Sequence, residues 1–329
     1  MQNLVQSAYD GFNVCVFAYG QTGSGKTFTM VGVQGGEAHL LGITPRAIAG
    51  LFSLIEENKD SAEATITCTM VEIYNDQLRD LFFLVENERA GGRLKAPKLD
   101  IKMDKKKRVF ISGSQLRDAA SPQDVLSHFD EGNSVRKVGS TKMNAESSRS
   151  HLVFNIMIEV NNKATGKTSM GKLTLVDLAG SERVGKTGAD AERLREAQSI
   201  NRSLAALGNV INALSTAEAE EGKVGHVPYR DNLLTRLLQD GLGGSAKTLM
   251  FVNVSPAADN AEETVSSLQY AERVKKITNS AAKSEESKEV RRLKNIIRRM
   301  RQGGGGDDPD AEGDEGEEDA ASTAGAAAS

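Results

Sequence analysis

The sequence predicts an α/β fold in which helices flank a central β-sheet. Three observations support this: several short apolar runs have the length of strands, helical periodicity appears between them, and a glycine-rich loop separates the first strand from the first helix. The chain has 329 residues, 39% hydrophobic and 26% charged, which suffices for one large domain or two small ones. No apolar run approaches the roughly 20 residues that span a bilayer, so we expect no membrane insertion.

Five apolar runs are predicted as strands. Residues 13–19 (NVCVFAY) are continuously apolar and end at Gly20, which is typical of a buried strand that enters a loop. Residues 65–74 (TITCTMVEIY) alternate in the manner of a half-buried strand. The remaining strands are expected at 151–160, 172–177 and 248–254. The two cysteines, Cys15 and Cys68, lie inside such runs, which predicts buried free thiols in a reducing compartment.

Helical periodicity fills the intervals between these strands. The clearest case is 199–214, whose apolar side chains recur on one helical face. The expected helices begin at Lys26 and span 199–214, 233–239 and 262–277. Residues 86–98 and 102–108 are charged and are interpreted as surface loops.

The strongest local signal is a phosphate-binding motif of the form G-x-x-x-x-G-K-[ST]. Its members are Gly20, Gln21, Thr22, Gly23, Ser24, Gly25, Lys26 and Thr27. Glycines let backbone amides turn toward phosphates, Lys26 supplies a positive charge for the β and γ phosphates, and the Thr27 hydroxyl is suited to Mg²⁺. Because the motif lies between a predicted strand and a predicted helix, it indicates a nucleoside triphosphate site.

A second element supports this site. The apolar strand that ends at Asp177 is followed by Leu178-Ala179-Gly180, so Asp177 is the expected second anchor for Mg²⁺. A lone aspartate at the end of a strand is more often a turn former, and it is the pairing with the phosphate loop that favours a metal role. No N-K-x-D motif occurs, which disfavours a Ras-like GTPase.

Four segments together resemble the signatures of the kinesin motor family. They are FAYGQTGSGKTFTM (17–30), NAESSRSH (144–151), VDLAGSE (176–182) and HVPYRDNLLTRLLQDGLGG (226–244), in the family's order. The resemblance extends from about residue 2 to 279. It implies a P-loop NTPase with a central mixed sheet, ATP and Mg²⁺ as ligands, and microtubule-stimulated ATP hydrolysis on the cytoplasmic cytoskeleton. A different P-loop ATPase, such as a helicase, would not be expected to carry NAESSRSH.

The resemblance also implies roles for individual residues. In the first switch, Ser148 would contact Mg²⁺ and Ser147 would help to hold the attacking water. In the second switch, the Gly180 amide would sense the γ phosphate. Arg149 and Glu182 would form the ion pair that closes the site and relays a proton, although such a pair taken alone would be an ordinary surface ion pair.

Microtubule contact is expected at the loop and helix after the second switch and near Tyr229. The candidates are Lys186, Arg193, Arg195, Arg230 and Arg236. The alternative for each of these residues taken alone is an ordinary solvated charge. Family members often carry Lys where this chain has Leu233, so we expect weaker, salt-dependent binding.

The C-terminal part predicts a basic amphipathic helix followed by an acidic tail. The apolar positions of the helix are Val290, Leu293, Ile296, Ile297 and Met300. This helix is similar to that of the kinesin-like calmodulin-binding proteins of plants and algae, which implies regulation by Ca²⁺–calmodulin or a related sensor. The alternatives are a neck or coiled-coil helix, or a helix packed on the core. The predicted organisation is therefore a motor domain at 1–279, the basic helix at 280–302 and a disordered tail at 303–329.

The charge is unevenly distributed between these parts. The formal net charge is −4, and the nine acidic residues of 303–329, without any base, account for −9 of it. Residues 1–302 therefore carry about +5, which favours an anionic partner and a tail able to compete for the same surface. A solubilising disordered end is the alternative. We expect no nucleic-acid partner.

The start of the chain departs from the family pattern. Kinesin cores have further strands before the phosphate loop, whereas nineteen residues precede Gly20 here. The resemblance therefore implies that Met1 is an internal methionine or the start of an incomplete gene model, and that this chain is marginally stable. The position of the motor near the C-terminus implies movement toward microtubule minus ends. The rival hypothesis is a non-motile microtubule-binding fragment with impaired nucleotide binding.

Overall fold

The computed structural model describes residues 1–286 except 34, 137–145, 183–190 and 220–225. These residues fall in a compact unit, Met1–Ser287, and the remaining unit, Lys288–Ser329, lies outside the description. Within the described part of the chain, no helix is long and apolar enough to cross a membrane.

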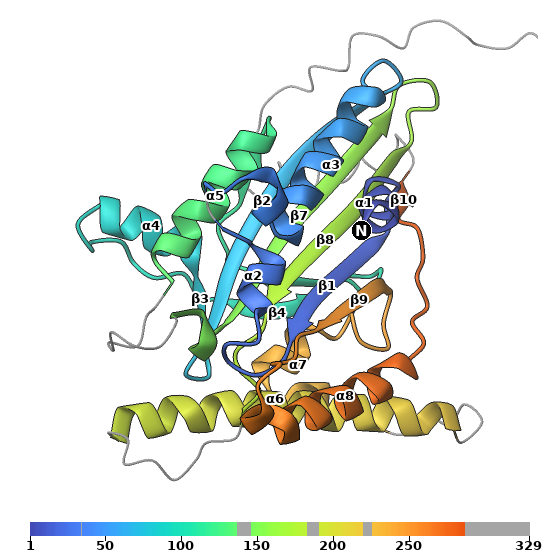
Figure 1. Cartoon of the computed structure of the whole chain (residues 1–329). Coiled ribbons are helices and arrows are strands. Elements are labelled where there is room, and N and C mark those ends of the chain that lie inside the picture. The colour runs from blue at the N-terminus through green and yellow to red at the C-terminus, as the bar shows by residue number, and fades with distance from the viewer. Residues whose placement is uncertain (34, 137–145, 183–190, 220–225, 287–329) are drawn as a thin grey trace, which may run out of the picture. The chain divides into compact units, whose positions relative to one another are not determined.

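The centre of the described unit is a mixed sheet in the order β3-β2-β7-β8-β1-β9 (Figure 1). Its strands are β1 Asn13–Tyr19, β2 Ala62–Tyr74, β3 Gln77–Asp80, β7 His151–Asn162, β8 Thr168–Asp177 and β9 Ala246–Val252. β1 runs parallel to both of its neighbours, β8 and β9, whereas β2, β7 and β8 are antiparallel to one another. The short strands β6 (Arg117–Ala119) and β10 (Glu285–Glu286) pair with β2 and β8, and β4 (Asp100–Met103) pairs with β5 (Val109–Ser112) in a separate hairpin.

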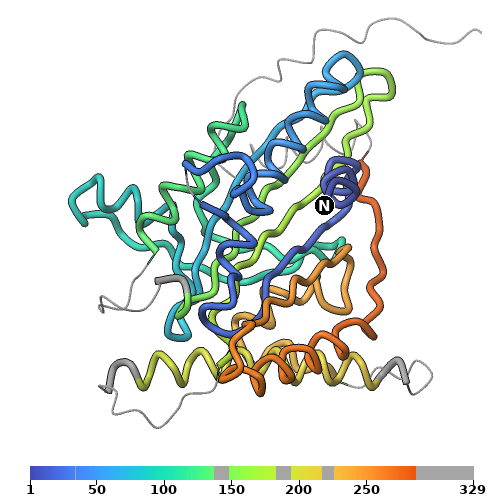
Figure 2. Tube along the Cα trace, in the orientation of Figure 1, coloured from blue at the N-terminus to red at the C-terminus, as the bar shows by residue number. Residues whose placement is uncertain are grey.

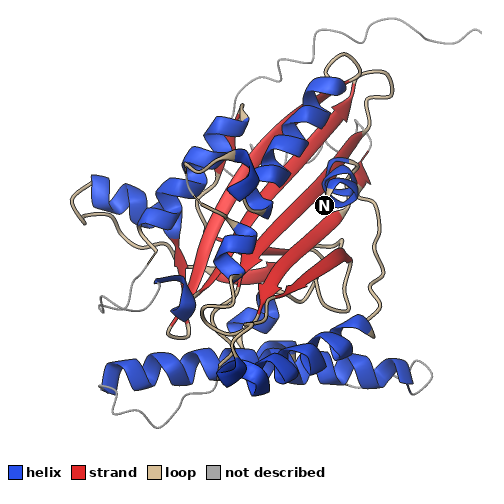
Figure 3. Cartoon of the chain, viewed as in Figure 1, coloured by secondary structure: helices blue, strands red, loops and turns tan. Residues whose placement is uncertain are grey.

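Helices cover both faces of the central sheet (Figure 3). The helices are α1 Gln2–Tyr9, α2 Lys26–Met30, α3 Ile43–Glu57, α4 Leu81–Arg89, α5 Pro122–Ser134, α6 Ala191–Ala219, α7 Leu233–Leu237 and α8 Ala261–Lys275. Because side chains alternate along a strand, β1 contributes to two cores. Val14 and Val16 pack in the core that contains α1, α3 and α5, while Cys15 and Phe17 pack in the core that contains α6, α7 and α8. The predicted α/β class with a mixed sheet is confirmed.

The predicted strands are all present, and the predicted helices are present with shifted ends. The helix expected at 199–214 extends over Ala191–Ala219 because polar residues continue it beyond its buried stripe. The loop prediction for 86–98 is wrong at its start: α4 runs to Arg89, capped by Asp80, whose Oδ1 accepts from the amides of Phe82 and Phe83. The prediction for 102–108 is wrong in the same way, since β4 reaches Met103 before the chain turns into β5.

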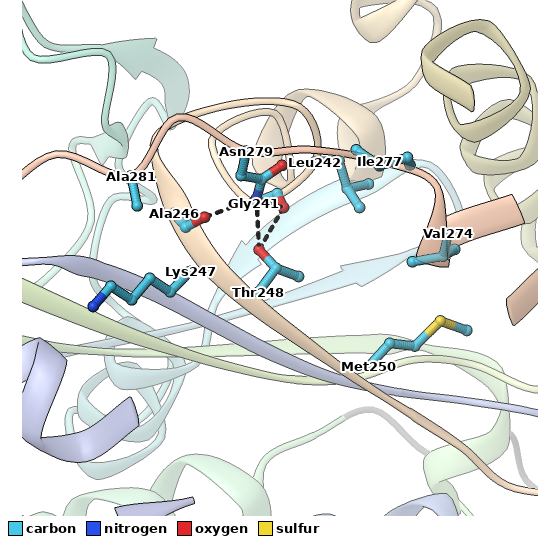
Figure 4. Close-up of a pocket in the computed structure, with 10 residues that line it drawn as sticks. All are labelled: Gly241, Leu242, Ala246, Lys247, Thr248, Met250, Val274, Ile277, Asn279 and Ala281. Atoms are coloured by element: carbon cyan, nitrogen blue, oxygen red, sulfur yellow. Dashed lines mark hydrogen bonds between the residues drawn. The ribbon is translucent and has the colours of Figure 1, made fainter. Parts of the chain in front are cut away.

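The segment after α8 runs back beside β9 toward the N-terminal part of the chain (Figure 2). Asn279 fixes its start, because its Nδ2 donates to Ala246 O at 2.7 Å and Gly241 O at 2.9 Å (Figure 4). Further on, the Ser284 amide donates to Gly11 O at 3.0 Å, and β10 follows. A pocket of about 260 Å³ lies between this segment and β9, lined in part by Met250 and Ile277.

Candidate nucleotide-binding site

The phosphate motif forms the turn between β1 and α2, where the sequence predicts it. β1 ends at Tyr19, and α2 begins at Lys26 with Gly25 as its N-cap residue. Within the turn, Ser24 Oγ donates to Gln21 O at 2.8 Å. A side chain at Gly20 would place its Cβ 2.1 Å from Asn253 O, so this close approach of two backbones requires glycine.

Lys26 is buried at the centre of this turn, with 6% of its surface exposed. Its Nζ donates to two backbone carbonyls, Gly20 O at 2.8 Å and Gln21 O at 2.9 Å. Burial lowers the pKa of Lys26, and the carboxylates of Asp177 and Glu182 oppose that shift. A buried ammonium group that donates to two carbonyl oxygens of the turn is suited to an incoming anion, because an anion would offset its desolvation.

Thr27 and Asp177 meet beside the turn, as a shared Mg²⁺ site requires. Thr27 Oγ1 donates to Asp177 Oδ2 at 2.9 Å. Asp177 Oδ1 is buried and finds no hydrogen-bond partner among the described residues. A hydroxyl oxygen and a carboxylate oxygen without a donor are the ligands that Mg²⁺ prefers, so these residues fit the ion.

The backbones of the two switches are joined next to this site. The Gly180 amide donates to Ser148 O at 2.9 Å, and the Ser181 amide donates to Gly20 O at 3.1 Å. Ser148 belongs to the short 3₁₀ helix η2, Glu146–Arg149, which leads into β7. The side chain of Ser147, the candidate for holding the water, lies outside the described residues.

The ion pair predicted between Arg149 and Glu182 is not formed in this arrangement of the switches. Arg149 Nη1 instead donates to Glu196 Oε2 at 2.9 Å. Both oxygens of Glu182 accept from Thr22, from its amide at 2.7 Å and from its Oγ1 at 2.5 Å. Glu196 lies 47 positions after Arg149 in the sequence and is brought to it by the packing of α6, so the motif alone gave no sign of this pairing.

Arg136 is a site residue that sequence reasoning missed. It is buried, with Nη1 3.3 Å from Asp177 Oδ2 and Nη2 donating to Ser150 O at 2.8 Å. Its Nε donates to Ser150 Oγ at 3.0 Å. Arg136 therefore holds the expected Mg²⁺ ligand Asp177 from the side of β7. Its position in an ordinary helix-to-loop sequence gave no signal of this role.

His151 connects the second switch to α6 and was also missed. Its Nδ1 accepts from the Ala179 amide at 3.0 Å, so in the neutral ring the proton resides on Nε2, which lies 2.7 Å from Ser203 Oγ. Ser203 Oγ in turn donates to Ile200 O at 2.7 Å. Burial, followed by the charges of Arg136 and Lys26, lowers the pKa of His151 to about 3, which keeps the ring neutral.

The predicted microtubule contacts are only partly placed by the structure. Arg195 is exposed near the start of α6, and Arg230 is exposed in the 3₁₀ helix η3, Tyr229–Asp231. Arg236 is hydrogen-bonded to the hairpin of β4 and β5, since its Nη2 donates to Ile101 O at 2.8 Å. Lys186, the side chain of Arg193 and the predicted calmodulin-binding positions lie outside the described residues; those positions are Val290, Leu293, Ile296, Ile297 and Met300.

Comparison with known proteins places this geometry in a family. The family model described as the kinesin motor domain matches residues 1–277. Kinesin-like protein KIN-14E of Arabidopsis thaliana is 47% identical over 294 residues, which are 89% of this chain and 22% of that protein. Kinesin-like protein KIN-14I of Oryza sativa subsp. japonica is 48% identical over the same shares. The chain thus spans about a fifth of the length of these curated relatives.

Solved structures agree with the sequence comparisons. The structure of a fast kinesin superposes with a TM-score of 0.74 at 41% identity, covering 87% of this chain and 76% of that one. The motor domain of the kinesin-like protein Kar3 of Saccharomyces cerevisiae superposes with a TM-score of 0.67 at 40% identity, covering 83% and 78%. Sequence, fold and site therefore point to one family.

Proposed function

This chain belongs to the kinesin motor family, and on that premise we propose that it couples ATP hydrolysis to microtubule binding and movement. The observation that carries the proposal is the junction of the phosphate loop with the second switch. Thr27 Oγ1 reaches Asp177 Oδ2 at 2.9 Å, next to the buried ammonium group of Lys26. Such a junction places a cation, a hydroxyl and a carboxylate where a Mg²⁺–triphosphate needs them.

The residues of the chain supply positioning and charge rather than covalent chemistry. Lys26 would hold the phosphates, and Thr27, Ser148 and Asp177 would hold Mg²⁺, which when bound neutralises charge on the phosphates. The Gly180 amide, now on Ser148 O, is the donor that would turn toward the γ phosphate. Glu182 would accept a proton relayed from the attacking water once it has left Thr22.

A microtubule-stimulated ATPase assay tests this function directly. We expect phosphate release that rises at least tenfold with added taxol-stabilised microtubules, and co-sedimentation that depends on the bound nucleotide. Microtubule binding that is insensitive to ATP analogues, with no hydrolysis, would instead support the rival hypothesis of a non-motile microtubule-binding fragment. The variant K59A is a suitable control, because Lys59 lies on the surface and pairs with Glu56.

Regulation by Ca²⁺–calmodulin is an additional and more specific part of the proposed function. It is supported by the sequence of residues 287–302, where seven Lys and Arg side chains accompany five apolar positions at helical spacing, outside the described structure. We expect Ca²⁺–calmodulin to reduce microtubule co-sedimentation of the full chain. The acidic residues 303–329 would contribute by competing for the basic face of the motor. A chain lacking 303–329 that is inhibited to the same extent would remove the tail from this proposal.

The direction of movement along the microtubule is the most specific part of the proposed function. The resemblance to kinesins with C-terminal motors supports movement toward microtubule minus ends. A gliding assay with polarity-marked microtubules measures it, using this chain fixed to a surface through its N-terminus. Gliding with the minus ends leading would contradict minus-end movement, because a minus-end motor drives microtubules with their plus ends leading.

A further inference from the structure

The segment that follows α8, residues 279–286, is attached to the sheet at its two ends. Asn279 holds its start, since its Nδ2 donates to two backbone carbonyls beside β9. At its end, the Ser284 amide donates to Gly11 O at 3.0 Å, and Ser284 O accepts from the Met170 amide at 2.9 Å. The three residues before Ser284 are exposed. The position of the end of this segment on β8 therefore depends on the contacts of Ser284 and of β10.

A lysine from the hairpin of β4 and β5 reaches this end of the segment. Lys106 lies in the turn 104–108, and its Nζ donates to Ser284 Oγ at 2.8 Å and to Glu285 O at 3.4 Å. The same Nζ lies 3.3 Å from Glu286 Oε1, whose side chain is 8% exposed. One ammonium group thus contacts three successive residues of the segment.

The turn of the hairpin keeps its shape through its own contacts. Asp104 Oδ1 accepts from the amides of Lys106 and Arg108, both at 2.8 Å. Arg108 Nε donates to Asp104 Oδ2 at 2.8 Å, and its Nη1 donates to Met170 O in β8 at 3.0 Å. Because the Met170 amide donates to Ser284, one residue of β8 contacts both the turn and the segment. Lys106 is therefore presented beside the segment by elements that are already in place, which lowers the entropic cost of its contacts.

The pairing of Lys106 with Glu286 stabilises the attached segment because the carboxylate is largely buried. A buried carboxylate is costly when its charge is not compensated, and detachment from β8 would return it to water. Loss of Lys106 should therefore favour detachment of residues 284–286. Lys106 itself is 35% exposed, so acidic groups in solution can reach it and compete with Glu286.

We propose that the contacts of Lys106 with residues 284–286 form a clasp, and that an acidic protein surface opens this clasp by drawing Lys106 away from Glu286. Lys105 and Lys107 are exposed on the same turn, so such a surface would meet three adjacent ammonium groups. Opening detaches the end of the segment and leaves its start in place. The inference does not rest on the proposed function, because it requires neither ATP hydrolysis nor movement.

Hydrogen–deuterium exchange of single amides in the full chain measures whether the clasp is closed. The attached segment protects the Ser284 and Met170 amides, and the Lys172 amide, which donates to Phe12 O, is the internal reference. We expect Lys106→Met to raise the exchange rates of Ser284 and Met170 about tenfold and to leave that of Lys172 unchanged. Poly-L-glutamate, added to the wild type at constant ionic strength, should raise the same two rates about threefold. It should have no further effect on Lys106→Met.

Further variants make the result specific. Lys105→Met is the matched control, because it removes the same charge from an exposed side chain of the same turn and should exchange as the wild type does. Glu286→Gln keeps the size of the side chain and should raise the Ser284 rate about threefold. Lys106→Glu should raise this rate at least as much as Lys106→Met. Adding Glu286→Lys to it should bring the rate back toward that of the wild type, because the ion pair is then restored with its charges exchanged.

The outcomes separate the clasp, its opening and the proposed function. If Lys106→Met leaves the Ser284 rate unchanged, or if Lys105→Met raises it as much, the clasp is overturned. An effect of Lys106→Met together with no effect of poly-L-glutamate overturns the role of an acidic surface. Should Lys106→Met fail to fold, a wild-type rate in Glu286→Gln with an intact thermal melt overturns the clasp as well. Absence of microtubule-stimulated hydrolysis refutes the proposed function alone, since the exchange rates are measured without nucleotide or microtubules.

Discussion

The phosphate loop and the switch pairs are neighbours in space but differ in how their contacts are determined. In the loop, Lys26 donates to Gly20 O and Gln21 O, six and five residues away in the chain. In the switches, Arg149 reaches Glu196 and Glu182 reaches Thr22, contacts that join residues 47 and 160 positions apart. The loop is thus a local device whose shape follows from its own sequence, while the partners of the switches depend on how α6 and β8 pack.

This difference separates the phosphate loop, whose shape is set by local contacts, from the switches, whose contacts depend on other elements. The bonds of the loop join residues within one turn, so the shape of this binding element depends on the turn's own sequence. The long-range pairs join separate elements, so they depend on how those elements are placed and would change if a ligand moved one of them. Substitutions in the loop should therefore remove binding altogether, whereas substitutions in the switches should alter hydrolysis with binding retained.

The largest effect is expected from Lys26→Ala, which alters the phosphate loop itself. The substitution removes the buried ammonium group and leaves the Gly20 and Gln21 carbonyls without their donor. We expect kcat/KM for ATP to fall on the order of 10³-fold and the affinity for labelled ADP to fall with it. Steady-state kinetics and equilibrium titration measure both. Retained ADP affinity would show that the loop is not the dominant binding element, and Lys59→Ala serves as the surface control.

Glu182→Gln should give the next largest effect and separate the two regions. Glutamine cannot accept a proton from the attacking water or form the ion pair with Arg149, so hydrolysis should fall on the order of 10²-fold. The amide oxygen of glutamine can still accept from Thr22, and Lys26 keeps its own bonds in the loop, so the affinity for labelled ADP should stay within about threefold of the wild type. Single-turnover hydrolysis and titration of the same preparation test this pair of outcomes. Equal losses in binding and hydrolysis would erase the proposed division between loop and switches.

The fold and the loop were predictable because their signals are local. The apolar run 13–19, the motif that follows it and the strand that ends at Asp177 each contain the information that places them. Helices α3 and α5 were not anticipated, because their buried faces become evident only against the sheet that they cover. Within the site, Arg136, His151 and Glu196 were missed for the same reason: each acquires its role from a partner at least 14 positions distant.

The smallest effect concerns His151, the buried link between the second switch and α6. Its pKa is lowered to about 3 in the folded protein, whereas its ordinary value is 6.5. Above pH 6.5 the ring is neutral in both states and adds no pH dependence. Between pH 6.5 and 3 the unfolded chain binds a proton that the folded chain does not, so stability falls as the pH falls. For this residue alone, the free energy of unfolding should drop by about 1.4 kcal/mol between pH 8 and pH 5.5.

Urea titrations at the two pH values measure this change, and His39→Asn is the control, because His39 is 70% exposed. The control should retain the pH dependence, and His151→Gln should lose it. The ring can also be followed in the wild-type protein by nuclear magnetic resonance, which does not require a folded variant. A His151 resonance that titrates near pH 6.5 would mean that the ring is not held between the Ala179 amide and Ser203. In that case the pair of Arg149 with Glu196 would still join the first switch to α6, but the second switch would lose its contact through His151, and the adjustable region would be smaller than the hydrogen bonds of this structure indicate.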